Sequence, residues 1–185
     1  MHLNIIHIVL FIGATLVTVK PVYAASWNVD LAQSTLGFEV VQGNNTLAGT
    51  FGFWTANIDF DPKTSETATI SAEIQPASAD TGNAQFNSTL PGPDWFDVTG
   101  FPAAQFNTNT VSHIEGNSYR ADGMLAIKGI DLPVVLDFTL DIDGDTAKAQ
   151  GTATLNRLDY QLGAGVGTDT VGDNVTVTLD LTATR

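Results

Sequence analysis

The sequence predicts an all-β protein with about eight antiparallel strands, folded as a sandwich or a closed barrel. Apolar and polar residues alternate strictly in one segment after another, whereas helical periodicity is nearly absent. Turn residues separate the alternating segments at short intervals. Many short alternating strands divided by turn signals are typical of antiparallel sandwiches and barrels.

The amino-terminal residues 1–24 resemble a secretory signal peptide. The segment from Asn4 to Val19 is almost wholly apolar, and Val22-Tyr23-Ala24 offers small residues where a signal peptidase cuts. The pattern departs from the usual one because no Lys or Arg precedes the apolar run, while Lys20 follows it. We predict cleavage after Ala24, one mature domain over residues 25–185, and a periplasmic or secreted location.

The expected strands follow one another along the mature chain. Alternation marks nine segments, which we interpret as about eight strands: 36–40, 47–53, 58–60, 68–74, 104–106, 119–127, 136–142, 147–155 and 175–181. Glu115-Gly116-Asn117 and Asp143-Gly144 predict tight hairpins, and residues 129–133 predict a short link. Strands that are consecutive in sequence should therefore be neighbours in space.

The segment from Pro76 to Pro102 is too long for an ordinary hairpin loop. We expect it to contain a short helix near Ala84 to Leu90 and to fold over one end of a barrel. Its aromatic residues then need burial.

Composition excludes several classes of function. The chain has no cysteine, so thiolate catalysis and iron–sulfur clusters are excluded. Residues 25–185 hold a single histidine, His113, which we interpret as a surface residue. The formal charge of −13 argues against nucleic acid and against stable association with anionic membranes. We therefore predict a protein that is not an enzyme and that uses no metal or other cofactor.

Two motifs have a structural interpretation. Residues 141–145 (Asp-Ile-Asp-Gly-Asp) lack the spacing of a calcium loop and are interpreted as a hairpin turn. Residues 163–167 lack the spacing of a dinucleotide fingerprint. Small residues on one strand face, Ala147, Ala149, Gly151 and Ala153, leave two interpretations open: bulky residues pack against them, or the barrel interior keeps space for a ligand.

An ordered set of short segments resembles the YceI-like family of polyisoprenoid-binding, lipocalin-like proteins. These segments are 27–30 (WNVD), 34–38 (STLGF), 47–51 (LAGTF), 58–61 (IDFD), 78–82 (SADTG), 95–97 (WFD), 101–106 (FPAAQF), 123–130 (GMLAIKGI), 133–134 (PV) and 157–160 (RLDY). The resemblance covers essentially the whole mature chain. It implies an eight-stranded antiparallel lipocalin-like barrel, with a long loop and short helix covering one end, periplasmic export, and a long isoprenoid held inside.

The chain departs from that family pattern at two places. Gln42 stands where many relatives have a histidine, and residues 85–89 (QFNST) stand where relatives have basic residues. If those positions recognise a head group in relatives, we expect a different head group to bind here.

We predict a carrier for a long-chain isoprenoid lipid of the polyprenyl or isoprenoid quinone type. The predicted ligand-binding residues are Phe38, Phe51, Phe53, Phe60, Ile70, Phe106, Leu125, Ile127 and Phe138 in the tunnel wall, with Trp95, Phe96 and Phe101 in the lid. The alternative is a secreted acidic structural or interaction barrel with a packed interior and no ligand. A homodimer is left open.

Overall fold

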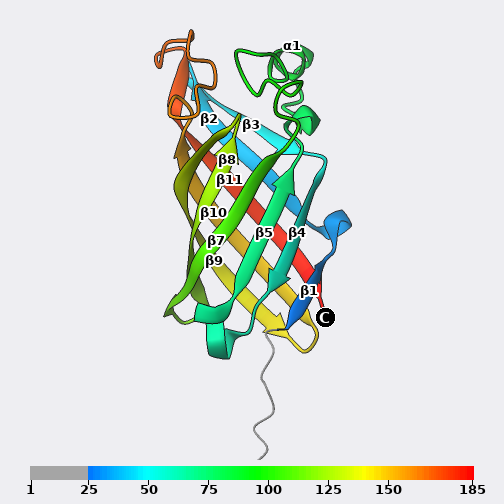
Figure 1. The fold of residues 1–185 in the computed structure, drawn as a ribbon. Helices are drawn as coiled ribbons and strands as arrows, with labels where there is room; N and C mark the ends of the chain where they lie inside the picture. Colours follow the sequence, from blue (N-terminus) through cyan, green and yellow to red (C-terminus); the bar gives the residue numbers. More distant parts are fainter. Residues whose placement is uncertain (1–24) are drawn as a thin grey trace, which may run out of the picture.

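Eight strand positions close on themselves in the computed structural model, which describes residues 25–185 (Figure 1). All pairings are antiparallel, and the last strand pairs with β10 on one side and with β1 and β2 on the other, which closes the ring. This confirms the predicted all-β barrel and decides between a barrel and a sandwich. The predicted signal peptide lies outside the described residues.

The sheet contains eleven strands within residues 25–185. They are β1 (Ser26–Val29), β2 (Thr35–Gln42), β3 (Asn45–Phe51), β4 (Trp54–Asp59), β5 (Thr69–Ile74), β6 (Ala79–Asp80), β7 (Ala104–Glu115), β8 (Ser118–Ile127), β9 (Ile130–Asp143), β10 (Thr146–Asn156) and β11 (Val171–Thr184). The helical elements are three short 3-10 helices, η1 (Leu31–Gln33), η2 (Pro62–Thr67) and η3 (Pro76–Ser78), and one α-helix, α1 (Ala84–Thr89).

Eleven strands form eight positions because three positions are interrupted. β1 and β2 are separated by η1, β3 and β4 by Gly52 and Phe53, and β5 and β6 by η3. The two strands of each interrupted position pair with the two strands of the next one. β1 pairs with β4 and β2 with β3, and then β4 pairs with β5 and β3 with β6. The first interruption has a local cause, since the Asp30 carboxylate accepts a hydrogen bond from the Ala32 amide and starts the helical turn.

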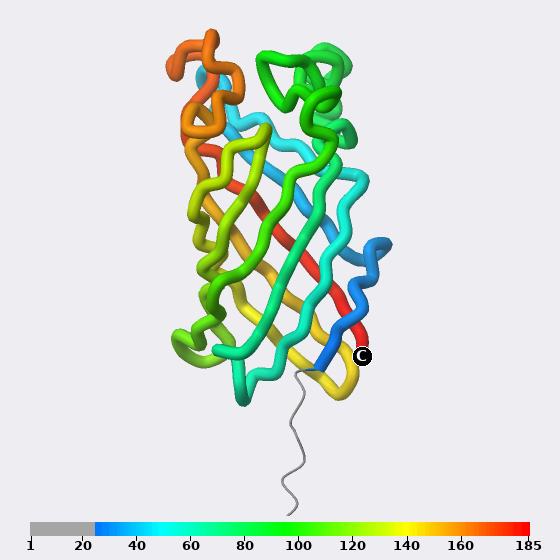
Figure 2. The backbone as a smooth tube through the Cα atoms, in the orientation of Figure 1, coloured from blue at the N-terminus to red at the C-terminus, as the bar shows by residue number. Residues whose placement is uncertain are grey.

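The barrel has two unlike ends (Figure 2). One end, which we call the mouth end, carries α1 and the four connections 43–44, 81–103, 128–129 and 157–170. The opposite end, which we call the floor end, carries Ala25, Arg185 and the short β7–β8 and β9–β10 hairpins. The long segment after β6 thus folds over one barrel end, as the sequence predicts.

Most of the predicted local structure is confirmed. A helix forms at Ala84–Thr89, and the hairpins at Gly116 and Gly144 place these glycines at φ of +55° and +59°. The predicted link at residues 129–133 is wrong in its extent. The turn consists of Lys128 and Gly129, both at positive φ, and β9 already begins at Ile130.

The apolar core is concentrated in the floor half of the barrel. It contains Val111 and Ala121, which are 1% and 0% exposed, together with aromatic side chains from four strand positions. A second, smaller cluster lies near the mouth end and includes Tyr160 and Leu162. No helix in residues 25–185 is long and apolar enough to cross a membrane.

Candidate functional site

A cavity of about 310 Å³ lies inside the barrel. Inward-facing side chains of all the long strands line it, and the loops of the mouth end contribute Phe86, Leu90, Trp95 and Leu162. Its volume falls at the lower end of the range that is usual for pockets that enclose small ligands. The interior of this barrel is therefore partly hollow.

Exposure along β11 shows which half is hollow. The inward side chains of Val175, Val177 and Leu179 are only half-buried, although they face the interior and line the cavity. Further along the same strand face, Leu181 and Ala183 are buried, with exposed fractions of 5% and 1%. The barrel is therefore open inside toward the mouth end and closely packed toward the floor end.

An aromatic cluster closes the floor end. The Trp27 indole Nε1 donates a hydrogen bond to the Phe60 carbonyl oxygen at 3.0 Å, and both residues are buried. The Phe60 ring packs edge-on against Tyr119 at 5.3 Å between centroids, and Tyr119 stacks on Phe138 at 5.5 Å. A ligand chain that enters from the mouth would end against these rings.

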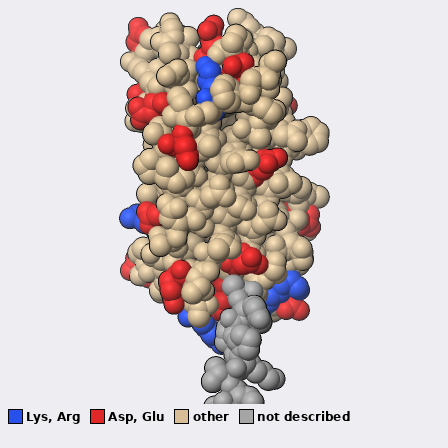
Figure 3. All heavy atoms as spheres, viewed as in Figure 1, with Lys and Arg blue, Asp and Glu red and all other residues tan. Residues whose placement is uncertain are grey.

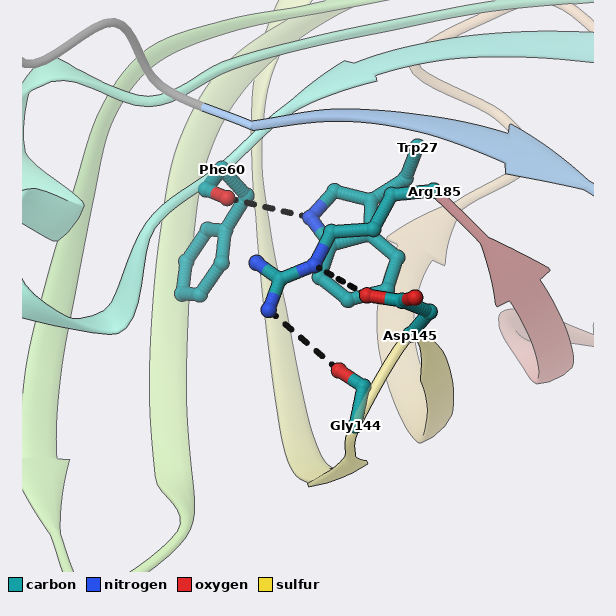
Figure 4. A network of polar contacts seen from close by, with 5 residues as sticks. All are labelled: Trp27, Phe60, Gly144, Asp145 and Arg185. Carbon is teal, nitrogen blue, oxygen red and sulfur yellow. Dashed lines mark hydrogen bonds and ion pairs between the residues drawn. The ribbon is translucent and has the colours of Figure 1, made fainter.

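The carboxyl-terminal residue covers this cluster from outside (Figure 4). The guanidinium of Arg185 lies 4.8 Å from the centroid of the Trp27 ring. It also donates hydrogen bonds to the Asp145 carboxylate and to the Gly144 carbonyl oxygen in the β9–β10 hairpin. These contacts connect β1, the residue that follows β11 and the β9–β10 hairpin across the floor.

Two loops meet across the mouth end. The Gly163 amide in the segment 157–170 donates a hydrogen bond to the Asp94 carbonyl oxygen in the segment 81–103 at 2.6 Å. The Trp95 ring lies against the Cα of Gly163, where a Cβ atom would approach it to 2.6 Å. Phe96 packs on Phe51 of the wall at 6.2 Å between ring centroids. The lid is thus fixed to the opposite loop and to the barrel.

Arg157 organises the loop 157–170 from inside. Its side chain is 1% exposed and donates five hydrogen bonds of 2.8–3.0 Å to backbone carbonyl oxygens. The acceptors are the carbonyl groups of Leu162, Gly163, Val166, Val171 and Gly172. All five guanidinium N–H groups therefore have partners, and none of these partners is a carboxylate.

Tyr160 fastens the same loop to the barrel. It is 2% exposed, and its hydroxyl donates to the Leu125 carbonyl oxygen at 3.2 Å. Burial, with smaller contributions from Asp131 and Asp159, raises the pKa of Tyr160 to about 12. The phenol therefore stays neutral at physiological pH.

Glycines make room for inward phenylalanine rings. Gly49 lies directly opposite Phe38, and a Cβ atom there would come within 2.4 Å of the Phe38 ring. Gly151 stands opposite Phe138, and a Cβ atom there would lie 2.9 Å from the Phe138 Cβ atom. Ala153, by contrast, lines the cavity. Both interpretations of the small-residue strand face thus apply, close packing at Gly151 and open space at Ala153.

The structure brings ten of the twelve predicted site residues to the cavity. They are Phe38, Phe51, Phe60, Ile70, Phe106, Leu125, Ile127 and Phe138 in the wall, with Trp95 and Phe96 at the mouth end. Strict alternation was sufficient to find the wall residues, because alternate side chains of a barrel strand point inward.

Phe53 and Phe101 do not line the cavity. Phe53 is 67% exposed because Gly52 and Phe53 form the interruption between β3 and β4, where the alternation of the two strands changes phase. Phe101 packs against Gly129 in the β8–β9 turn, where a Cβ atom would lie 2.7 Å from its ring.

Sequence reasoning also missed residues that shape the site. Trp27 and Tyr119 form the floor, and Arg157 and Tyr160 hold the loop 157–170. The motif 157–160 belongs to the family pattern, but a charged residue at a strand end gives no sign that its partners are carbonyl groups.

The wall is apolar except at the mouth end. Within residues 25–185, its polar lining residues are Gln42, Thr89 and Arg157, and no carboxylate or histidine of this range lines it. His113 lies elsewhere, exposed near the β7–β8 hairpin, where its Nε2 is 2.9 Å from the Gly116 carbonyl oxygen. The cavity is thus suited to holding an apolar chain.

Comparison with known proteins agrees with this architecture. The model of the YceI-like domain matches residues 27–183, which is nearly all of the described chain. The chain belongs to the YceI-like family. Among curated YceI-like relatives, a UPF0312 protein of Pseudomonas syringae pv. tomato is 26% identical over 177 residues, covering 90% of this chain and 92% of the relative.

Solved structures with the YceI-like fold are similar over most of their length. BcnA of Burkholderia cenocepacia is 31% identical with a TM-score of 0.80, covering 85% of this chain and 100% of BcnA. A polyisoprenoid binding domain from Saccharophagus degradans, implicated in plant cell wall breakdown, is 16% identical with a TM-score of 0.69, covering 88% of this chain and 99% of that domain. The second likeness shows the shared fold.

Proposed function

We propose that this YceI-like protein binds a long apolar lipid of the isoprenoid type inside its barrel and acts as a non-catalytic carrier. The observation that supports this most directly is the hollow mouth half of the barrel, closed at the floor by aromatic rings and lined almost wholly by apolar side chains. The likeness to a polyisoprenoid binding domain points to the same ligand class.

The energetics favour such a ligand. Burial of each methylene group contributes about 0.8 kcal/mol before the costs of association, so a prenyl tail gains affinity without any charged contact. The closed floor and the partly exposed lining residues at the mouth, among them Gln42, Leu47 and Val171, support entry of the tail from the mouth end. A structural barrel without a ligand would gain nothing from leaving this volume unfilled.

We also propose that the carrier works outside the cytoplasm. Residues 1–24 have the composition of an export signal, and a soluble carrier is needed where an apolar chain has to cross water between membranes. Cell fractionation, together with the intact mass of the isolated protein, tests this. A mass that corresponds to residues 25–185 supports the proposal, and a cytoplasmic protein that retains residues 1–24 contradicts it.

Native mass spectrometry and organic extraction of the purified protein test the function. We expect a bound lipid whose fragments carry the repeating mass of isoprene units. Val177→Phe should reduce the bound fraction, because Val177 lines the cavity. Thr176→Phe is the matched control, because its side chain stands on the other face of the same strand. Absence of lipid from the wild-type protein, with no uptake of added isoprenoid, would refute the proposal.

A further inference from the structure

Basic groups are scarce at the mouth of the cavity. Residues 25–185 contain six Lys and Arg residues, and the mouth-end connections with their adjoining strand ends hold two of them, Lys128 and Arg157. An anionic head group at the mouth would therefore have these two cations as its nearest partners in the described chain.

Both cations are already engaged with backbone carbonyl groups. Arg157 is buried and uses all five of its N–H groups on carbonyl oxygens of the loop 157–170 and the start of β11. Lys128 donates from Nζ to the Pro93 carbonyl oxygen at 2.7 Å and so ties the β8–β9 turn to the lid. Turning Arg157 toward a phosphate would break contacts that hold the loop 157–170, and turning Lys128 would release the β8–β9 turn from the lid.

Acidic residues outnumber these cations at the mouth end. The same connections and strand ends carry seven: Asp80, Asp94, Asp97, Asp131, Asp159, Asp169 and Asp173. On the face shown in Figure 3, acidic side chains are spread over the mouth-end loops around a single group of basic atoms. Their summed potential repels an anion that approaches the opening.

The backbone N–H groups at the start of α1 are not available to bind an anion in place of a cation. The Asn83 side-chain oxygen accepts hydrogen bonds from the Gln85 and Phe86 amides, which would otherwise point outward from the start of this short helix. These two N–H groups are therefore engaged within the chain.

Uncharged polar groups do face the cavity near its opening. Gln42 closes the inward face of β2 and lines the cavity, and within residues 25–185 its side chain makes no hydrogen bond. Its amide can both donate and accept. Thr89 donates its hydroxyl to the Gln85 carbonyl oxygen at 2.8 Å and keeps acceptor capacity.

We propose that the cavity selects lipids whose polar end is uncharged, a hydroxyl or a carbonyl group that the Gln42 amide can bind, and rejects prenyl phosphates. This inference rests on the proposed lipid binding and narrows its ligand class. The physical reason is that an anionic end would lose hydration at a mouth where residues 25–185 offer no uncommitted cation and carry an excess of acidic groups.

Two probes with the same tail, geranylgeraniol and geranylgeranyl diphosphate, test the selection. Binding to the lipid-free mature protein is followed by tryptophan fluorescence, because Trp27, Trp54 and Trp95 all line the cavity. We expect the alcohol to bind at least about tenfold more tightly than the diphosphate. Equal binding, or tighter binding of the diphosphate, overturns the inference and leaves lipid binding intact. Failure of both probes to bind overturns the proposed function, and this inference with it.

A charge placed at the opening gives a second readout. Gln42→Lys should raise the affinity for the diphosphate about tenfold and should not raise the affinity for the alcohol, whose hydroxyl loses the Gln42 amide. Gln150→Lys is the matched control, because this substitution adds the same charge on the outer surface. The Gln150 side chain is exposed there and contacts Asp180. An equal gain in both variants would mean that net charge alone governs binding, and would overturn the role of Gln42.

Discussion

The Trp27 indole donates a hydrogen bond of 3.0 Å to the carbonyl oxygen of Phe60, and this bond joins the first strand of the barrel to the end of β4. Trp27 is 5% exposed and Phe60 is 3% exposed. Because both residues also line the deepest part of the cavity, the same contact closes the barrel and forms the surface against which a ligand tail would end.

Loss of this bond should destabilise the barrel. Trp27→Phe leaves the Phe60 carbonyl oxygen buried without its partner, which costs about 1–3 kcal/mol in free energy of unfolding. Urea denaturation followed by circular dichroism measures the change. Leu31→Ala, at a side chain that is 49% exposed, should change stability by less than about 0.5 kcal/mol. A Trp27→Phe protein as stable as the wild type would contradict the role of the bond.

Arg157 should stabilise the loop 157–170 more than any surface cation stabilises its surroundings. Arg157→Met removes five hydrogen bonds to buried or half-buried carbonyl groups, and we expect a loss of about 3 kcal/mol in stability. Hydrogen exchange should show faster exchange of the Gly163 and Val166 amides.

The control for this change is Arg120→Met. Arg120 pairs with Asp137 at 2.7 Å, but both side chains are about half exposed, so its loss should change stability far less than the loss of Arg157. Similar effects of the two substitutions on stability and on loop exchange would show that Arg157 does not organise the loop.

The sequence predicted the barrel wall well because alternation is a local property. Phe38 and Phe106 point inward because their strands are regular around them. The register of strand pairing places inward residues of neighbouring strands side by side. The prediction for Phe53 was wrong for the same reason. The interruption at Gly52 changes the phase of the alternation, and Gly52 is the single turn residue that marks this change in the sequence.

The floor and the lid depend on contacts that are distant in sequence. Trp27 lies in a strand of four residues, too short for alternation to reveal, and its partner Phe60 is 33 residues away. Arg157 binds a set of carbonyl groups that exists only after the loop has folded. The open space beside Ala153 likewise depends on which rings reach across the barrel, and composition alone could not decide it.

Alkaline pH should weaken the fold through Tyr160. Its folded-state pKa is raised to about 12 from the ordinary value of 10.0, chiefly by burial, so the folded protein favours the neutral phenol. The resulting contribution to stability is complete below about pH 10 and is lost as pH rises toward about 12. Denaturation experiments across this range should show the loss, and Tyr160→Phe should reduce it. An unchanged pH profile in Tyr160→Phe would assign the loss to other groups.

Two alanines test directly where the barrel is hollow. Ala153 lines the cavity, whereas Ala121 is 0% exposed and lies in the packed floor half. Ala153→Leu should place its added methyl groups in open space, so stability should stay within about 1 kcal/mol of the wild type while uptake of isoprenoid falls. Ala121→Leu adds the same atoms where no room exists, and should cost about 1–3 kcal/mol or more in stability. Denaturation midpoints and lipid uptake of the two variants give the comparison. If Ala153→Leu is as destabilised as Ala121→Leu, the mouth half of the barrel is packed in solution, and the cavity cannot be the place where a lipid tail is held.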